Sequence, residues 1–308
     1  MMQKNAILEV KELKQHFKVN SKYTVKAVDG ISFKIYPGET YSLVGESGSG
    51  KSTTGRSIIR LYEPSSGDII FNGEEISGKL SKENDKMLRT KMQMIFQDPM
   101  ASLNPRKKVM DIIGQGLDIH KMVKNDQERE QRVFDILKLV GLSPEHATRF
   151  PHQFSGGQRQ RIGIARALVM EPDLVIADEA ISALDVSIQA QVVNLMKEIQ
   201  KQTNVAYLFI AHDLSMVKYI SDRIGVLHLG HLVETGTTEE IFTNPIHPYT
   251  KSLISAIPLP NPMIERDRHP LTYDYEQSGL DYEAGTLTHI EGQHYVLGTL
   301  DDLKSWNA

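Results

Sequence analysis

Residues 45–53, with the sequence GESGSGKST, follow directly on the apolar run TYSLV and limit the folds open to this chain. The run predicts a buried strand, and the segment after it matches the pattern G-x-x-x-x-G-K-[ST]. Glycines let backbone N–H groups turn inward around phosphate oxygens, which side chains would block. A strand, a phosphate loop and a helix that directs its positive end at the loop together predict an α/β core.

Two side chains of this loop have predicted chemical roles. Lys51 places a point charge near the β- and γ-phosphates of a nucleotide, and the Ser52 hydroxyl is a hard oxygen ligand suited to Mg²⁺. A Gly/Ser loop that matches by chance is the alternative, and the strand before it argues against that alternative. The predicted phosphate-binding residues are Gly45, Glu46, Ser47, Gly48, Ser49, Gly50, Lys51, Ser52 and Thr53.

Composition narrows the class of protein. The chain has 308 residues, which suits one large domain plus an appendage. The formal net charge of −4 gives no support to a general nucleic-acid-binding surface, so no nucleic-acid partner is expected. There is no cysteine, which excludes disulfides and thiolate metal sites. No uncharged apolar run approaches the roughly 18 residues that span a bilayer.

Hydrophobic patterns place further elements along the chain. Alternation in ISFKI predicts a strand, and Asn72-Gly73 is a hairpin turn signal. Apolar residues at helical spacing over residues 126–140, followed by Gly141, predict a helix and its stop. DLVIAD and VAYLFIAHD are best interpreted as central parallel strands, with residues 186–202 as the crossover helix between them.

The run LVIAD ends in two adjacent carboxylates, Asp178 and Glu179. A strand that ends in Asp downstream of a phosphate loop suits contact between Asp178 and Mg²⁺. Glu179 then lies next to the γ-phosphate, where it is predicted to position or deprotonate a water molecule. The alternative is that one carboxylate caps the next helix, and the phosphate loop favours the catalytic interpretation.

Six segments together resemble the motifs of the ABC-transporter ATPases. FSGGQRQR is similar to the signature motif of that family, and the phosphate loop, MIFQDP, LVIADE, SALD and IAHD occur in the family order. This resemblance covers residues 6–245. NPIHPYTKSLISAIP is similar to the C-terminal motif of the oligopeptide/dipeptide importer branch.

The resemblance implies a fold and a domain organisation. The expected fold is α/β, a P-loop NTPase core with an antiparallel β subdomain, an inserted helical subdomain and a small C-terminal extension. Residues 1–245 would form the ATP-binding domain, with the helical subdomain inserted at about 98–165. Residues 246–308 would form the extension, which ends in an acidic tail.

The resemblance also implies ATP and Mg²⁺ as ligands and assigns roles to single residues. Ser52, Gln97 and Asp178 would serve Mg²⁺ or its waters, and Gln97 would also hinge the helical insert. Glu179 would be the general base, and His212 would contact the γ-phosphate.

An aromatic side chain is expected to stack on adenine. Phe17 is the preferred residue and Tyr23 is the alternative. Simple burial in a strand would also explain Phe17.

In this family two ATPase subunits meet head to tail, so the signature segment would serve the ATP of the neighbouring chain. SGGQ has the form of a capping box, which leaves free N–H groups and a positive dipole end at the start of a helix. Ser182 would lie at the same interface, and Asp185 would lie there while also capping its own helix. The predicted nucleotide contacts of this segment are Ser155, Gly156, Gly157, Gln158 and Asp185.

The implied function is hydrolysis of ATP to power an importer of oligopeptides at the cytoplasmic face of the cell membrane. The expected partners are a homologous sister ATPase, two transmembrane permease subunits that hold this chain at the membrane, and an extracytoplasmic peptide-binding protein. A dipeptide, nickel or glutathione importer remains open. A soluble ABC ATPase of DNA repair or translation is disfavoured by the short span between Gln97 and Ser155 and by the single phosphate loop.

Ala180 departs from the family pattern, which usually has proline after the catalytic glutamate. Proline restricts the residue before it to extended backbone, so alanine would leave Glu179 less restrained. We expect a working site, and an Ala180→Pro variant that holds or raises turnover.

Five further histidines are not expected to bind a metal. Four of them show no convincing metal-ligand spacing and are expected to have surface or packing roles, and His247 in HPYT is expected to help fold the extension. Residues 271–308 hold seven Asp/Glu and one Lys, and this acidic tail is expected to be a solvated surface or a contact with another subunit. The five histidines are His228, His231, His247, His289 and His294.

Overall fold

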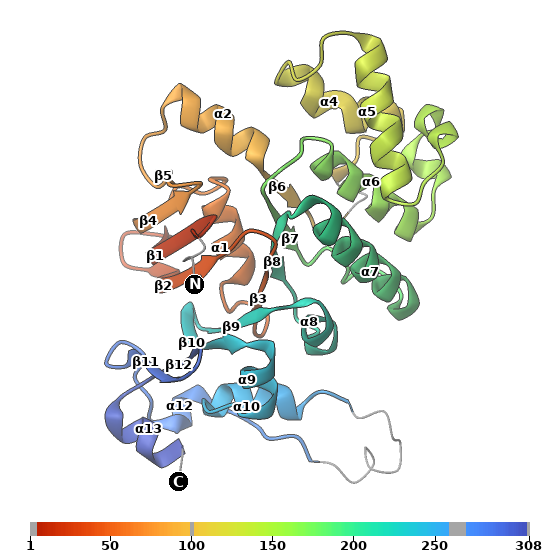
Figure 1. Cartoon of the computed structure of the whole chain (residues 1–308). Coiled ribbons are helices and arrows are strands. Elements are labelled where there is room, and N and C mark those ends of the chain that lie inside the picture. The colour runs from red at the N-terminus through yellow and green to blue at the C-terminus, as the bar shows by residue number, and fades with distance from the viewer. Residues whose placement is uncertain (1–4, 99–101, 259–268, 307–308) are drawn as a thin grey trace.

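The chain folds around two β-sheets, one large and mixed and one small and antiparallel (Figure 1). A computed structural model describes residues 5–98, 102–258 and 269–306. The strands are β1 (Leu8–Lys18), β2 (Thr24–Ile35), β3 (Thr40–Val44), β4 (Ser66–Phe71), β5 (Glu74–Glu75), β6 (Met92–Ile95), β7 (Leu174–Asp178), β8 (Ala206–Ile210), β9 (Arg223–His228), β10 (His231–Thr237), β11 (Thr286–Glu291) and β12 (His294–Gly298). The helices are α1 (Lys51–Ile58), α2 (Lys82–Lys91), α4 (Val109–Ile119), α5 (Asp126–Leu139), α6 (Gly156–Leu168), α7 (Val186–Thr203), α8 (Leu214–Ile220), α9 (Thr238–Thr243), α10 (Pro248–Ser255), α12 (Tyr275–Ser278) and α13 (Leu300–Trp306), with 3-10 turns η1 (Pro144–Thr148) and η2 (Pro151–Gln153).

Parallel strands form the centre of the large sheet, whose order is β11-β12-β10-β9-β3-β8-β7-β6. β3 pairs in parallel with β8 and β9, and β7 pairs in parallel with β6 and β8. Every residue of β3, β7 and β8 is buried, as expected for parallel strands with both faces covered. These central strands, and α7 as the crossover helix, confirm the sequence predictions. The carboxyl ends of the strands meet at one edge, where open α/β sheets bind their ligands.

The small antiparallel sheet, with the order β2-β1-β4-β5, packs on one side of this core (Figure 1). The ring of Phe33 in β2 stacks on the ring of Tyr41 in β3, with centroids 4.9 Å apart. Asn72 and Gly73 have φ angles of +51° and +83°, so they form the predicted tight turn between β4 and β5. The antiparallel subdomain expected from the family resemblance is therefore present.

Helices α4, α5 and α6, with η1 and η2, form a helical insert between β6 and β7 (Figure 1). The side chain of Asn125 caps α5 by accepting a hydrogen bond from the N–H of Glu128 at 2.9 Å. Gly141 follows this helix with a φ of +73°, which confirms the predicted stop. Leu137 and its neighbours join the apolar core around β7. The start of the predicted insert includes residues 99–101, which lie outside the described residues.

The C-terminal extension continues the large sheet, because β12 pairs with β10 and β11 pairs with β12. The fully buried carboxylate of Glu234 in β10 accepts three hydrogen bonds from this extension. The donors are the N–H groups of Ile246 (2.8 Å) and His247 (3.1 Å) and Nε2 of His294 (2.7 Å). His247 and His294 are buried and pack inside the fold. The tail folds onto the core through β11, β12 and α13, and six of its seven Asp/Glu side chains are exposed, which agrees with the expected solvated acidic surface.

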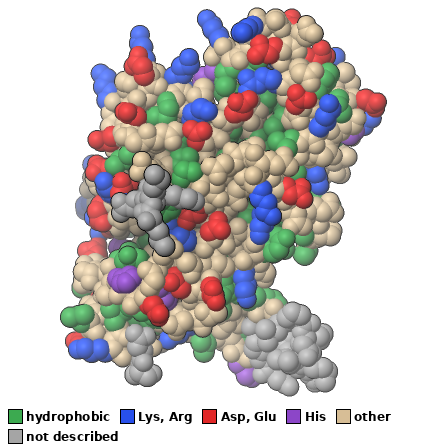
Figure 2. All heavy atoms as spheres, in the orientation of Figure 1, with side chains coloured by type: hydrophobic (Ala, Val, Ile, Leu, Met, Phe, Trp, Pro, Cys, Tyr) green, Lys and Arg blue, Asp and Glu red, His purple; other side chains and the backbone are tan. Residues whose placement is uncertain are grey.

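Two surface features bear on the class of protein. No helix in the described ranges is both long enough and apolar enough to cross a membrane. On the face shown in Figure 2, Lys and Arg side chains are interspersed with Asp and Glu.

Candidate active site

The phosphate loop between β3 and α1 wraps around the ammonium group of Lys51. Nζ of Lys51 donates hydrogen bonds to the carbonyl oxygens of Gly45 and Glu46, each at 2.7 Å. Gly45 has a φ of +147°, and a Cβ there would lie 2.1 Å from the carbonyl oxygen of Leu227. Only glycine fits this position, as the sequence pattern required. Burial lowers the pKa of Lys51, and the nearby carboxylates, first Glu179 and then Asp178, oppose this shift.

Asp178 lies at the end of β7 and faces the start of α1. Oγ of Ser52 donates a hydrogen bond to Oδ1 of Asp178 at 2.6 Å, and Nη2 of Arg56 forms an ion pair with Oδ2 at 3.1 Å. Asp178 is 1% exposed, so its carboxylate depends on these partners. The hydroxyl and carboxylate oxygens are hard donors of the kind that Mg²⁺ prefers, and they fit the predicted metal site.

Arg56 is a residue of this site that the sequence interpretation missed. It lies four residues after Ser52 on α1, so both side chains lie on the same face of the helix. That spacing is the signal that could have identified it, once Ser52 had been assigned to the metal.

Glu179 and His212 follow the ends of the neighbouring strands β7 and β8. Nδ1 of His212 lies 3.8 Å from Oε1 of Glu179. The side chain of His212 is 58% exposed and that of Glu179 is 21% exposed, so both are open to an incoming ligand. The structure therefore brings the phosphate loop, Asp178, Glu179 and His212 together at one edge of the sheet.

The backbone of Glu179 changes the expectation for Ala180. Glu179 has a φ of +49°, in the left-handed region, while its N–H donates to the carbonyl oxygen of Ile210 at 2.9 Å. A proline at position 180 favours extended backbone at position 179 and therefore opposes this conformation. The sequence-based expectation that Ala180→Pro holds or raises turnover is revised accordingly.

We expect Ala180→Pro to lower ATP turnover by about 10- to 100-fold, because displacing a catalytic group by about 1 Å can cost about 100-fold. ATP affinity should be unchanged, since the substitution leaves the phosphate loop intact. Steady-state kinetics of the assembled complex measure both quantities. Ala180→Ser is the matched control, because it leaves the backbone of Glu179 unrestricted. Equal turnover in the proline variant and the wild type would show that the left-handed conformation of Glu179 is not needed.

Gln97 lies two residues after β6, and its side chain is exposed. It lines the groove beside the helical insert that Arg56 also lines. Because Arg56 contacts Asp178 directly, a single arginine side chain links the groove that holds Gln97 to the carboxylate that is predicted to bind Mg²⁺.

The signature segment begins α6 as predicted. Oγ of Ser155 accepts a hydrogen bond from the N–H of Gln158 at 3.3 Å, and Oε1 of Gln158 accepts one from the N–H of Ser155 at 3.0 Å. A Cβ on Gly157 would lie 2.6 Å from Cγ2 of Ile188 in α7. Asp185 occupies the N-cap position of α7, and its side chain makes no cap hydrogen bond with the described residues of that helix. Its predicted capping role is therefore wrong, and the carboxylate stays available for other contacts.

The two candidate adenine-binding aromatics differ in their surroundings. Phe17 near the end of β1 is half-buried and packs edge-on against Tyr62, with ring centroids 5.3 Å apart. Tyr23 is 59% exposed, just before β2. The contact with Tyr62 holds the Phe17 ring in one orientation, which favours Phe17 as the stacking platform.

Phe17→Ala is expected to weaken ATP binding by about 5- to 150-fold, because stacking a base on an aromatic ring contributes about 1–3 kcal/mol. Binding titrations of the purified chain with ATP measure the loss. Tyr23→Ala removes a comparable aromatic group and serves as the control, with expected affinity near that of the wild type. A larger loss of ATP affinity in Tyr23→Ala than in Phe17→Ala would assign the adenine contact to Tyr23.

Comparison with known proteins identifies the family to which this chain belongs. The ABC transporter family matches residues 28–182, and the family described as "Oligopeptide/dipeptide transporter, C-terminal region" matches residues 233–277. The chain is 61% identical over 302 residues to the oligopeptide transport ATP-binding protein OppF of Bacillus subtilis (strain 168), which covers 98% of this chain and 99% of that protein. It is 53% identical over 301 residues to the dipeptide transport ATP-binding protein DppF of Lactococcus lactis subsp. cremoris (strain MG1363), which covers 97% of this chain and 96% of that protein.

Comparison with solved structures identifies the fold of the same family. The chain matches cbiO1 from Clostridium perfringens, part of the ABC transporter complex cbiONQ, with a TM-score of 0.69 and 30% identity over 78% of this chain and 91% of that one. It also matches the dimeric ATP-binding cassette MJ0796 in a post-hydrolysis state bound to ADP and Pi, with a TM-score of 0.68 and 27% identity over 75% of this chain and 98% of that one.

The chain belongs to the ABC transporter ATPases, and the predicted α/β P-loop fold is confirmed. As a member of that family it binds and hydrolyses ATP. The second family match confirms the predicted resemblance to the oligopeptide/dipeptide branch.

Proposed function

We propose that this chain is the F-type ATPase subunit of an oligopeptide permease, and that it hydrolyses ATP to power uptake of oligopeptides. The observation that carries the proposal is similarity over nearly the full length, including the C-terminal extension, to a protein named for oligopeptide transport. The DppF relative keeps a dipeptide importer as the second candidate. A nickel or glutathione importer is a weaker alternative, because neither solute appears among these relatives.

The proposed reaction uses the edge of the sheet where β3, β7 and β8 end. Lys51 and the loop amides hold the phosphates of ATP, and Ser52, Asp178 and Gln97 would hold Mg²⁺. The bound cation would supply positive charge that offsets the charge developing on the phosphates. Glu179 orients a water molecule and accepts its proton. Exposed His212 reaches the γ-phosphate from the end of β8.

We propose that the site is completed by a sister ATPase arranged head to tail. The capping box of Ser155 and Gln158 leaves the first N–H groups of α6 directed outward, and Ser155 and Gly156 are exposed. These groups suit the γ-phosphate of an ATP held by the sister chain. The free carboxylate of Asp185 and the exposed side chain of Val186 would face the same partner. The relative MJ0796 is dimeric in its solved structure.

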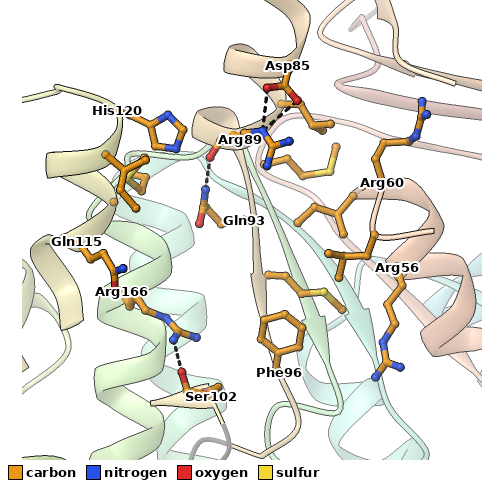
Figure 3. Close-up of a pocket in the computed structure, with 18 of the residues that line it drawn as sticks. Arg56, Arg60, Asp85, Arg89, Gln93, Phe96, Ser102, Gln115, His120 and Arg166 are labelled. Atoms are coloured by element: carbon orange, nitrogen blue, oxygen red, sulfur yellow. Dashed lines mark hydrogen bonds and ion pairs between the residues drawn. The ribbon is translucent and has the colours of Figure 1, made fainter. Parts of the chain in front are cut away.

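The groove beside the helical insert is the proposed contact with the permease subunits. It measures about 1020 Å³ and is lined by residues of α1, α2, β6, α4 and α6 (Figure 3). Phe96 and Ile119 expose apolar surface there, with Ile119 at 64% exposure. Arg60 and Arg166 add positive charge, whereas Arg89 is paired with Asp85 in the same groove. This lining suits a short segment with apolar and acidic side chains, supplied by a permease at the cytoplasmic face of the membrane.

Co-purification tests the proposed assembly. A tagged chain extracted with detergent from its native cells should carry the sister ATPase and both permease subunits, together with a peptide-binding protein when peptide is present. Recovery of the tagged chain with nucleic acid, and without membrane subunits, would instead favour a soluble ABC ATPase.

Uptake by the purified complex in lipid vesicles tests the solute. ATP-dependent accumulation should be stronger for oligopeptides than for the alternative solutes. A stronger response to dipeptides, glutathione or nickel would replace the oligopeptide proposal with the corresponding alternative.

A further inference from the structure

A tyrosine of the C-terminal extension contacts the phosphate loop directly. The hydroxyl oxygen of Tyr249, in α10, accepts a hydrogen bond from the backbone N–H of Glu46 at 2.8 Å. Tyr249 is 1% exposed, so its hydroxyl, rather than water, is the hydrogen-bond partner of the Glu46 N–H. The contact joins two segments that are 203 residues apart in the chain.

Glu46 connects this contact to the phosphate-binding lysine. The N–H of Glu46 binds Tyr249, and its carbonyl oxygen accepts a hydrogen bond from Nζ of Lys51 at 2.7 Å. The same carbonyl accepts the N–H of Ser49 at 3.2 Å. Glu46 therefore contacts both the extension and Lys51. A shift of Glu46 would move one of the acceptors of the Lys51 ammonium group.

The helix that carries Tyr249 is anchored firmly enough to hold the loop. Glu234 binds the N–H groups of the two residues before α10, and Nδ1 of His247 accepts the N–H of Tyr249 at 3.1 Å. The Tyr249 ring packs on His228, with centroids 4.0 Å apart. His228 follows Leu227, whose carbonyl oxygen closely approaches Gly45 of the loop. The extension and the end of β9 thus form one rigid support behind the phosphate loop.

We propose that Tyr249 is a positioning residue for ATP binding, which acts through Glu46 to hold the phosphate loop and Lys51 in the conformation that receives the phosphates. The C-terminal extension thereby influences the ATP affinity of a site to which it supplies none of the proposed nucleotide contacts. Burial raises the pKa of Tyr249, so its hydroxyl stays neutral and acts as a hydrogen-bonding group throughout the physiological range. The inference rests on ATP binding at this loop, and it does not depend on which solute is transported.

Tyr249→Phe tests the inference, because it keeps the ring and removes only the acceptor of the Glu46 N–H. Steady-state ATPase kinetics of the assembled complex should show a KM for ATP that is about 5- to 30-fold higher, since a buried donor left without its acceptor costs about 1–2 kcal/mol. The kcat at saturating ATP should stay within about twofold, because Glu179 and its surroundings are untouched. ATP titrations of the isolated chain should show a similar fold-loss of affinity.

Tyr273→Phe is the matched control. Its hydroxyl bonds that of Tyr282 at 3.1 Å, in the same aromatic cluster but without contact to the loop. Thermal unfolding of both variants measures any general loss of stability. A raised KM in Tyr249→Phe alone supports the inference, whereas equal KM values in both variants, raised or unchanged, overturn it. Failure of the wild-type chain to bind ATP would instead overturn the proposed function.

Discussion

Replacing Glu179 by glutamine lowers the ATP turnover of the assembled complex by about 10²–10⁴-fold, the usual cost of losing a general base. Glutamine has nearly the shape of glutamate and cannot accept the proton of the attacking water. ATP affinity is retained, because Lys51, Ser52 and the loop glycines are unchanged. The complex should therefore accumulate with ATP bound and the two ATPase subunits closed, which single-turnover kinetics and nucleotide retention on a desalting column both detect.

Glu171→Gln is the matched control for this prediction. It removes the same charge at an exposed position three residues before β7 begins. There Glu171 pairs with Arg132. Its turnover should equal that of the wild type. If Glu179→Gln hydrolysed ATP as fast as this control, the assignment of Glu179 as the base would fail.

Replacing Glu234 by alanine destabilises the chain by about 3–5 kcal/mol, the cost of removing one partner from a buried charged network. The substitution leaves the N–H groups of Ile246 and His247 and the imidazole of His294 buried without their acceptor. The first consequence should be loosening of the C-terminal extension. Urea unfolding of the full chain gives the free energy, and hydrogen exchange should show faster exchange in α10 and β12 than in β3 or β8.

Glu239→Ala is the control for this loss of stability, because Glu239 is an exposed carboxylate in the first turn of α9. Its removal should change the free energy of unfolding by about 0.5 kcal/mol or less. Similar effects of the two substitutions would mean that the hydrogen bonds of Glu234 do not hold the extension to the core.

The parts of the site that sequence alone predicted are those that local chemistry dictates. A glycine-rich loop needs positive φ angles and close backbone approach, so its residues can be identified without neighbours in space. Asp178 and Glu179 follow a fully apolar strand, and the strand itself fixes the edge of the sheet at which they lie. The capping box at Ser155 can likewise be identified from four consecutive residues.

The parts that the sequence did not predict depend on contacts between distant segments. Arg56 was not identified because its partner, Asp178, lies 122 residues further on. The hydrogen bond between Tyr249 and Glu46 has no local pattern either. The pairing of β12 with β10 was also missed, since strand pairing over such a distance is set by tertiary packing rather than by propensity. The φ of Glu179 is a fourth case, because the fold imposes this left-handed backbone on a residue other than glycine.

If ATP hydrolysis at this site drives peptide uptake, hydrolysis and uptake must be coupled in the complete importer. Vesicles that contain the importer and its peptide-binding protein are supplied with ATP, and hydrolysis is followed together with uptake of a labelled oligopeptide. We expect peptide to stimulate hydrolysis, and we expect hydrolysis and uptake to be lost together in Glu179→Gln. Peptide uptake at the wild-type rate by that variant, or hydrolysis without uptake by the wild type, would contradict this coupling.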